Sequence, residues 1–114
     1  MAYDGITLFN ACEDALDEWE AAIDERQAAH DAAIEAKRAY RVALTAEMGR
    51  LDIAVTAREA WAKGIPSVAD LRAEAERMEN AAECADSAMY YRMERYRHLK
   101  WMLESELRRP ERGA

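Results

Sequence analysis

Carboxylates are the side chains of this sequence with the most evident chemistry, because seven of them fall between Glu13 and Glu25 with no basic residue among them. Clustered carboxylates can bind a cation, imitate the phosphates of a nucleic acid, or form one side of a helix pair whose other side has the opposite charge. Glu94 and His98 are a further pair of potential metal ligands, four residues apart on one helical face. Carboxylate-bridged di-metal bundles use Glu-x-x-His on two helices, and this spacing is missing. The pattern therefore predicts no metal site and an ordinary Glu94–His98 hydrogen bond.

The sequence lacks the patterns that carry catalysis. It has only two histidines, His30 and His98, and neither a glycine-rich phosphate loop nor a G-x-S-x-G turn. Nothing combines a nucleophile, a base and a stabilising group, so we predict no enzyme, no catalytic residue and no cofactor. His30 is predicted to be a satisfied interior residue. Cys12 and Cys84 lack C-x-x-C spacing and are predicted to be small buried apolar groups.

Composition points to a helical protein with protein partners. The chain has 114 residues, 51% of them apolar and 34% charged, and only six are glycine or proline. This length predicts one domain, residues 1–114, with a thin core unless it finds a partner. A net charge of −7 argues against direct binding of nucleic acid or of an anionic membrane. The longest apolar run is far below the ~18 residues that span a bilayer, and the N-terminus lacks a leader pattern, so we expect a cytoplasmic protein.

Two long stretches have the three-four spacing of apolar residues that is typical of an amphipathic helix. They predict helices over about 7–48 and 68–109, with an N-terminal segment, 1–6, and a flexible tail, 110–114. The two predicted apolar faces are Phe9, Cys12, Leu16, Trp19, Ile23, Arg26, His30, Ala33, Lys37, Tyr40 and Leu44, and Val68, Leu71, Ala75, Met78, Ala82, Ala85, Met89, Arg92, Tyr96, Leu99 and Leu103.

Capping residues predict where these helices begin and end. Thr7 is the first candidate N-cap and Asp4 the second, and Gly49 marks a stop near Met48. A short helix over about 57–63 is predicted to form an elbow between the long helices, because two possible capping boxes flank it. These boxes are Thr56 with Glu59 and Ser67 with Asp70; between them, Gly64 suits a left-handed C′ position and Pro66 blocks continuation.

Matching lengths and a short connector predict an all-α antiparallel hairpin or coiled coil, which could dimerise into a four-helix bundle. Residue i then faces residue ~116 − i, so Trp19 lies near Tyr96. Residues 1–35 contain ten acidic and one basic residue, and residues 92–112 contain seven basic and four acidic, so opposite charges meet. We expect Glu13 and Glu20 to flank the seam opposite Arg95 and Lys100. The remaining carboxylates are predicted on the outer face, where they form a solvated or decoy surface: Asp14, Asp17, Glu18, Asp24, Glu25, Asp31 and Glu35.

Aromatic residues predict an interaction surface on the second long helix, because they lie outside the set that supplies its seam. Exposed aromatic residues mixed with arginine are typical of interface cores. The predicted anchors are Tyr90, Tyr91, Met93 and Trp101; packing by Tyr3 and Ile6 of the N-terminal segment is the alternative. Trp61, on the elbow helix, is predicted to dock between the long helices, with a partner anchor as its alternative.

Residues 28–109 resemble small helical-hairpin proteins encoded by phages and prophages, many without an assigned function. The resemblance lies in "GRLDIAVTAREAWAKGIPSVADLRAEAER" and in the Tyr-rich "AMYYRMERYRHLKWMLESELRR". It implies a phage or mobile-element protein that inhibits or adapts a host or phage nucleic-acid-binding or defence protein, as anti-CRISPR inhibitors do. In that interpretation the acidic residues and the aromatic anchors form the partner-binding surface, and a homodimer is expected. A self-assembling structural coiled coil and an accessory of phage recombination or replication are the alternatives.

Overall fold

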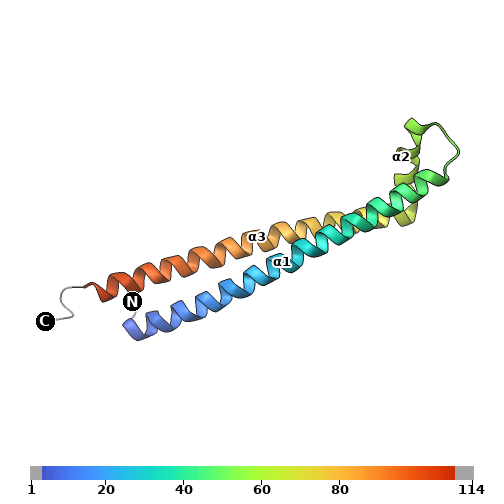
Figure 1. The fold of residues 1–114 in the computed structure, drawn as a ribbon. Helices are drawn as coiled ribbons and strands as arrows, with labels where there is room; N and C mark the ends of the chain where they lie inside the picture. Colours follow the sequence, from blue (N-terminus) through green and yellow to red (C-terminus); the bar gives the residue numbers. More distant parts are fainter. Residues whose placement is uncertain (1–3, 110–114) are drawn as a thin grey trace. The chain divides into compact units, whose positions relative to one another are not determined.

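Three helices make up almost all of the described chain. The computed structural model describes residues 4–109, with α1 at Gly5–Arg50, α2 at Val55–Lys63 and α3 at Pro66–Leu107 (Figure 1). No strand occurs between residues 4 and 109. The all-α class, with two long helices and a short one between them, is confirmed, and each predicted boundary lies within two residues of the observed one. Gly5 and Ile6, predicted outside the helix, belong to α1; residues 1–3 and the predicted tail, 110–114, lie outside the described residues.

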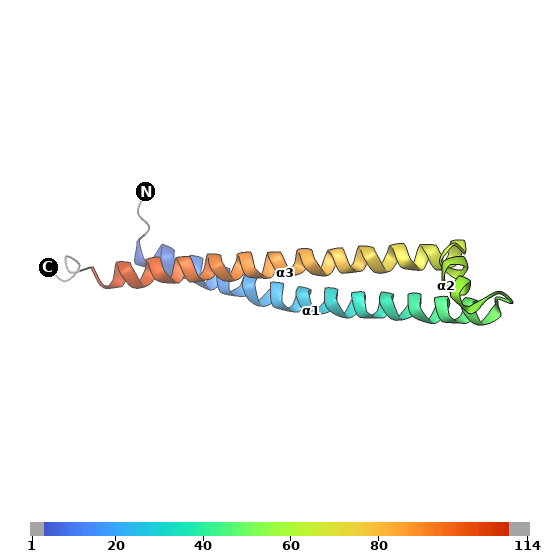
Figure 2. The same cartoon turned by 90° about the horizontal axis from the view of Figure 1, so that it is seen from above.

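The long helices pack against each other in two compact units. One unit contains the chain up to Arg26 and from Ala85 onward; we call it the terminal unit. The other is Gln27–Cys84, the elbow unit. In the terminal unit the rings of Trp19 and Tyr96 lie 5.6 Å apart between centroids, which confirms the predicted antiparallel register there. The start of α1, in blue, and the end of α3, in red, run side by side in opposite directions (Figures 1 and 2).

The elbow unit contains its own antiparallel pair. The second half of α1 and the first half of α3 run alongside each other and are joined through α2 (Figure 2). Lys37 and Glu79 form an ion pair between the two helices. Their numbers add to 116, so the register expected from equal helix lengths also holds within this unit. The hairpin-like arrangement of the elbow unit therefore follows from two helices that reverse direction over a short connector.

Alanine forms much of the seam between the long helices. On α1 the buried residues are Leu8, Cys12 and Ala15, at steps of four and three, then Ala22, seven residues on, and Ala33. On α3 they recur every seven residues, at Val68, Ala75, Ala82 and Met89. Alanine side chains occupy little space, so the two helices can approach closely. Of all described residues, only Val68 is a large side chain that becomes completely buried. The core is therefore made mostly of methyl groups.

Nine of the eleven residues of the predicted apolar face of α1 are buried or half-buried, and two are exposed. Cys12, Trp19, Arg26, Ala33 and Tyr40 lie at the seam or half-buried beside it, as expected. The prediction is wrong for Phe9 and Ile23, whose exposed fractions are 53% and 44%. The seam also includes a series that was not predicted, one residue earlier in the sequence and buried or half-buried throughout: Leu8, Ala15, Ala22, Ala29, Ala36 and Ala43. Close packing favours the smaller series and leaves the bulkier residues on the flank.

The N-terminus of α1 is capped by Asp4. The backbone N–H of Thr7 donates a hydrogen bond to Oδ1 of Asp4 at 2.6 Å, which is the contact that an N-cap carboxylate makes with the third residue of a helix. Thr7 lies inside the helix, so the first predicted N-cap is wrong and the second is confirmed. Gly49 does not stop α1, which continues to Arg50.

Neither predicted capping box is present at the elbow. The residue before α2 is Ala54, which makes no side-chain cap, and Thr56 lies within the first turn. Glu59 instead forms an ion pair with Lys63 at 2.8 Å, and this hydrogen-bonded lysine lowers the pKa of Glu59. Helix α2 begins two residues earlier than predicted, which removes the threonine from the capping position.

Proline, rather than serine, begins α3. Pro66 is the first helical residue, a position where its missing N–H costs nothing and its fixed φ suits the helix. Ser67 is therefore inside the helix, and the predicted box with Asp70 is wrong. Gly64 has φ −81° and ψ −9°, a right-handed conformation, so its predicted left-handed role is also wrong.

The two cysteines differ in environment. Cys12 is buried in the seam, as predicted, whereas Cys84 is exposed and that prediction is wrong. Burial, together with the neighbouring Glu13 carboxylate, raises the pKa of the Cys12 thiol. The exposed Cys84 is consequently the more accessible thiol.

Enlarging the alanine seam should destabilise the fold. Ala22→Leu places three additional carbon atoms between the helices, and overpacking of this kind costs about 1–3 kcal/mol. Ala21→Leu is the matched control, because Ala21 is exposed on the same turn. Urea unfolding followed by circular dichroism, at one protein concentration, measures both. Equal effects of the two substitutions would contradict an alanine seam.

Removing the α1 cap should also lower stability. We expect Asp4→Ala to cost about 1 kcal/mol, since the Thr7 N–H loses its partner. Thr56→Ala and Ser67→Ala should have no capping effect, because neither side chain caps a helix. Thermal unfolding of the three variants tests this, and a larger loss for Thr56→Ala than for Asp4→Ala would refute the assignment.

Candidate protein-binding surfaces

Glu18 joins the two helices of the terminal unit on one flank of the seam. Its Oε2 lies 3.1 Å from an Arg92 Nη1 and 3.5 Å from an Arg95 Nη1. The prediction that acidic α1 and basic α3 meet is thus confirmed, but with other partners. Glu18 was predicted on the outer face, whereas Glu13 and Glu20 were predicted to pair with Arg95 and Lys100. The difference follows from the alanine seam, which turns α1 so that Glu18 faces the arginines.

Arg26 makes a second connection within this unit. Its Nε donates to Oδ1 of Asp86 at 2.6 Å, and its guanidinium lies 6.0 Å from the centre of the Tyr90 ring. The hydrogen bond to Asp86 raises the pKa of Arg26. Sequence reasoning placed Arg26 at the seam without a partner. The near-complementary numbers of Arg26 and Asp86, which add to 112, were the signal available for this pair.

Four exposed carboxylates form an acidic face on the outer side of α1: Asp14, Asp17, Asp24 and Glu25. None of them forms an ion pair with another described residue. Two further carboxylates, Glu13 and Glu20, are also exposed and unpaired among residues 4–109. The predicted outer location is confirmed for the acidic face. The other three predicted members have partners: Glu18 pairs with the two arginines described above, Asp31 accepts a hydrogen bond from Gln27, and Glu35 pairs with Arg38.

An aromatic stripe lies on the outer side of α3. Its residues are spaced by about two helical turns and then by about one turn: Tyr91, His98 and Trp101. The exposed fractions of Tyr91 and Trp101 are 62% and 63%. The His98 and Trp101 rings stack at 6.2 Å between centroids, and Arg92 lies 5.7 Å from the Tyr91 ring centre. The expected Glu94–His98 pair is not formed, because Glu94 pairs with Arg97 at 3.4 Å. We call Tyr91, His98 and Trp101 the outer stripe.

A second apolar surface follows the side of the seam away from Glu18. Because Trp19 faces Tyr96, one turn further along α1 and one turn back along α3 bring Ile23 and Met93 to the same level. In the same antiparallel register, Leu16 is level with Lys100 and Phe9 is level with Leu107. The lateral strip consists of Phe9, Leu16, Ile23, Tyr90, Met93 and Leu107; Leu16 and Met93 are half-buried and the others are exposed. Met93, predicted among the exposed anchors, thus contributes only part of its surface.

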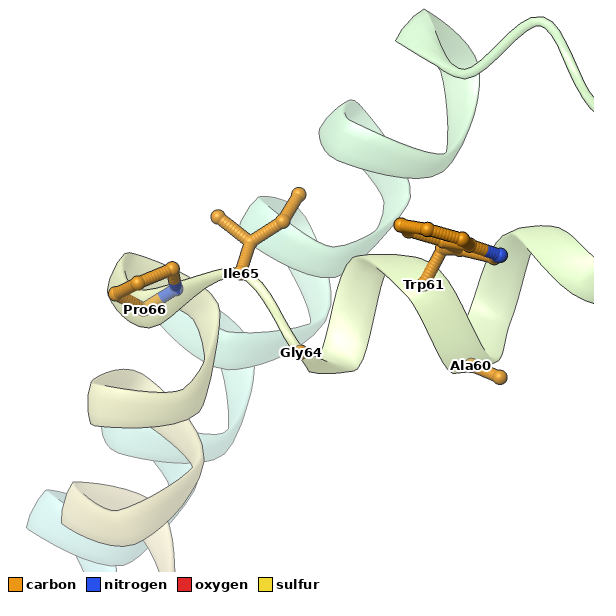
Figure 3. Close-up of a pocket in the computed structure, with 5 residues that line it drawn as sticks. All are labelled: Ala60, Trp61, Gly64, Ile65 and Pro66. Carbon is orange, nitrogen blue, oxygen red and sulfur yellow. The ribbon is translucent and has the colours of Figure 1, made fainter.

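Trp61 lies at an open depression of the elbow unit. The depression has a volume of about 470 Å³ and is lined by Ala60, Trp61, Gly64, Ile65 and Pro66 (Figure 3). Trp61 is 67% exposed, and the next residue, Ala62, is the one that α2 buries. The prediction that Trp61 docks between the long helices is therefore wrong. Successive residues point about 100° apart on a helix, so burial of Ala62 turns Trp61 toward solvent.

Comparison of the chain with protein-family models, with curated proteins and with solved structures gave no match. In the described part of the chain, no group of three or more histidine, cysteine or acidic side chains could hold a metal ion. No helix of residues 4–109 combines the length and the apolar character needed to cross a membrane.

The Glu18 contacts should contribute little stability and should depend on salt. Glu18→Ala removes two partly exposed ion pairs, for which we expect a loss of about 0–1 kcal/mol that shrinks as salt rises. Asp17→Ala is the control, since Asp17 has no ion pair among the described residues. Chemical unfolding at low and high salt measures the difference. A larger loss for Asp17→Ala would show that the flank is assigned wrongly.

Proposed function

We propose that this chain is a non-catalytic protein-binding protein. The supporting observation is an imbalance in the terminal unit: seven large apolar side chains are exposed there and only Leu8 and Met89 are buried, among the residues described. Exposed apolar surface of this extent is typical of protein interfaces. The exposed set is Ile6, Phe9, Ile23, Tyr90, Tyr91, Trp101 and Leu107.

The partner we propose has a basic surface. The acidic face presents Asp14, Asp17, Asp24 and Glu25 without internal ion pairs, so the charges are available to a partner. A negative surface attracts a basic partner from a distance and speeds association, particularly at low salt. Basic surfaces of this kind are common where proteins hold nucleic acid.

The outer stripe supplies the apolar anchors for this partner. Tyrosine, tryptophan and arginine are the residues that contribute most to binding at interface centres. Tyr91 and Trp101 are exposed and lie close to Arg92 and His98. Their side chains are partly held in place by these neighbours, which reduces the entropy lost on binding.

The resemblance to phage-encoded helical hairpins suggests the biological setting. We propose that the protein acts in the host cytosol and inhibits or adapts a host nucleic-acid-handling or defence protein, in the manner of an anti-CRISPR inhibitor. Occupation of a basic groove by the acidic face would exclude nucleic acid from that groove. The chain's own net charge of −7 disfavours direct binding to nucleic acid.

Capture from a bacterial lysate with chemical cross-linking tests this proposal. We expect a basic, nucleic-acid-binding protein cross-linked to the terminal unit. Neutralising the acidic face with Asp14→Asn, Asp17→Asn, Asp24→Asn and Glu25→Gln should slow association and weaken its salt dependence. Trp101→Ala should lower affinity about tenfold to 100-fold by faster dissociation.

A matched control keeps the net charge of the neutralised variant but changes other sites. Asp31→Asn, Asp52→Asn, Asp70→Asn and Glu83→Gln remove the same number of charges from exposed positions of the elbow unit. This variant should bind as the parent protein does. Recovery of no protein other than the chain itself, or equal loss in both variants, would contradict the proposal.

A further inference from the structure

We infer that the lateral strip is the interface of a homodimer in which α1 of each copy lies on α3 of the other. This surface is separate from the acidic face and the outer stripe, but four of its residues, Phe9, Ile23, Tyr90 and Leu107, also belong to the exposed apolar set that supports the proposed function. Phe9, Ile23, Tyr90 and Leu107 are exposed along the strip, and Leu16 and Met93 are half-buried within it. Both α1 and α3 contribute residues, so the strip is a surface of the helix pair and not of a single helix.

The seam alone offers little apolar burial to the terminal unit. Its two large buried side chains are Leu8 and Met89, and its other buried residues are Cys12, Ala15 and Ala22. A second layer packed on the lateral strip would bury the bulkier residues that the alanine seam leaves outside. Burial of apolar side chains between two layers is also what stabilises the association of helix pairs into four-helix bundles.

The charges beside the strip identify a second copy as the occupant. On the α1 side, Glu13 and Glu20 precede Leu16 and Ile23 by three residues each, so they lie on the same side of the helix. On the α3 side are Lys100, which lies between Met93 and Leu107 on the same line of the helix, and Arg97 beside it. Glu13, Glu20 and Lys100 form no ion pair among the described residues, and Arg97 pairs only with Glu94 of its own helix. The strip is thus acidic on its α1 side and basic on its α3 side.

This polarity is self-complementary under one two-fold symmetry. When the two-fold axis runs along the helices, α1 of one copy lies on the partner's α3 at the same level, and the two acidic sides meet the two basic sides. Glu20 then comes level with the partner's Arg97, and Glu13 lies near the partner's Lys100. When the axis instead runs across the helices, α1 meets α1 and like charges face each other, which is unfavourable.

Sedimentation of the full-length chain over about 1–100 µM tests the dimer. The parent protein should sediment as a dimer. Ile23→Lys should raise the dimer Kd about 100-fold or more, as expected for a central interface residue. Ile34→Lys is the matched control, because Ile34 is an exposed isoleucine of the same helix in the elbow unit; it should leave the Kd unchanged. Circular dichroism establishes that each variant is folded.

Charge exchange tests the symmetry. Glu13→Lys with Glu20→Lys gives one variant, and Arg97→Glu with Lys100→Glu gives another. Each alone should dimerise at least tenfold more weakly than the parent protein, and a mixture of the two should form heterodimers of near-parental affinity. Monomers at every concentration, or parental affinity of Ile23→Lys, would overturn the interface. Undiminished dimers of both charge variants would overturn the proposed symmetry.

Discussion

Close packing of alanine along the seam is the constraint on which the rest of the structure depends. Ala15 and Ala22 in the terminal unit, and Ala33, Ala75 and Ala82 in the elbow unit, are buried between α1 and α3. Small side chains let the helices approach, and they also fix the rotation of each helix about its axis. That rotation decides which of the larger and charged residues face the partner helix, which lie on the flanks and which face outward.

Both the charge pattern and the apolar pattern of the terminal unit follow from this rotation. It brings Glu18 to Arg92 and Arg95 on one flank and leaves Phe9 and Ile23 on the other. It also leaves the acidic face and the outer stripe on opposite helices, each without cover from the seam. A seam of leucine would have held more of the apolar surface inside, whereas an alanine seam leaves it available for association.

Trp19 shows how packing and hydrogen bonding compete at the seam. Its ring contacts Tyr96, and its Nε1 is buried without a hydrogen-bond partner among residues 4–109. An unsatisfied buried donor costs about 1–3 kcal/mol. Burial of a tryptophan ring and its contact with a second aromatic ring offset that cost. Trp19 is therefore held in place by apolar packing. A polar replacement of Tyr96 would remove part of the packing that offsets the cost of the unsatisfied N–H.

The sequence by itself determined the class of fold, the three helices to within two residues at each boundary, and the register that brings Trp19 to Tyr96. These features depend on helical periodicity, breakers and helix length, all of which are local or additive along the chain. The sequence also placed the acidic face outside, since few carboxylates can be buried at acceptable cost. Asp4 as a cap was available as the second of two candidates.

Only the tertiary structure decided which series of residues forms the seam. The sequence pattern favoured Phe9, Leu16 and Ile23, because most of their side chains are larger and more apolar than those of the neighbouring series. Leu8, Ala15 and Ala22 recur at the same interval of seven residues. The choice between two adjacent series depends on how near the facing helix can come, which is a property of the pair. For the same reason the partners of Glu18 and Arg26, the exposure of Trp61 and the lateral strip became evident only when the helices were packed together.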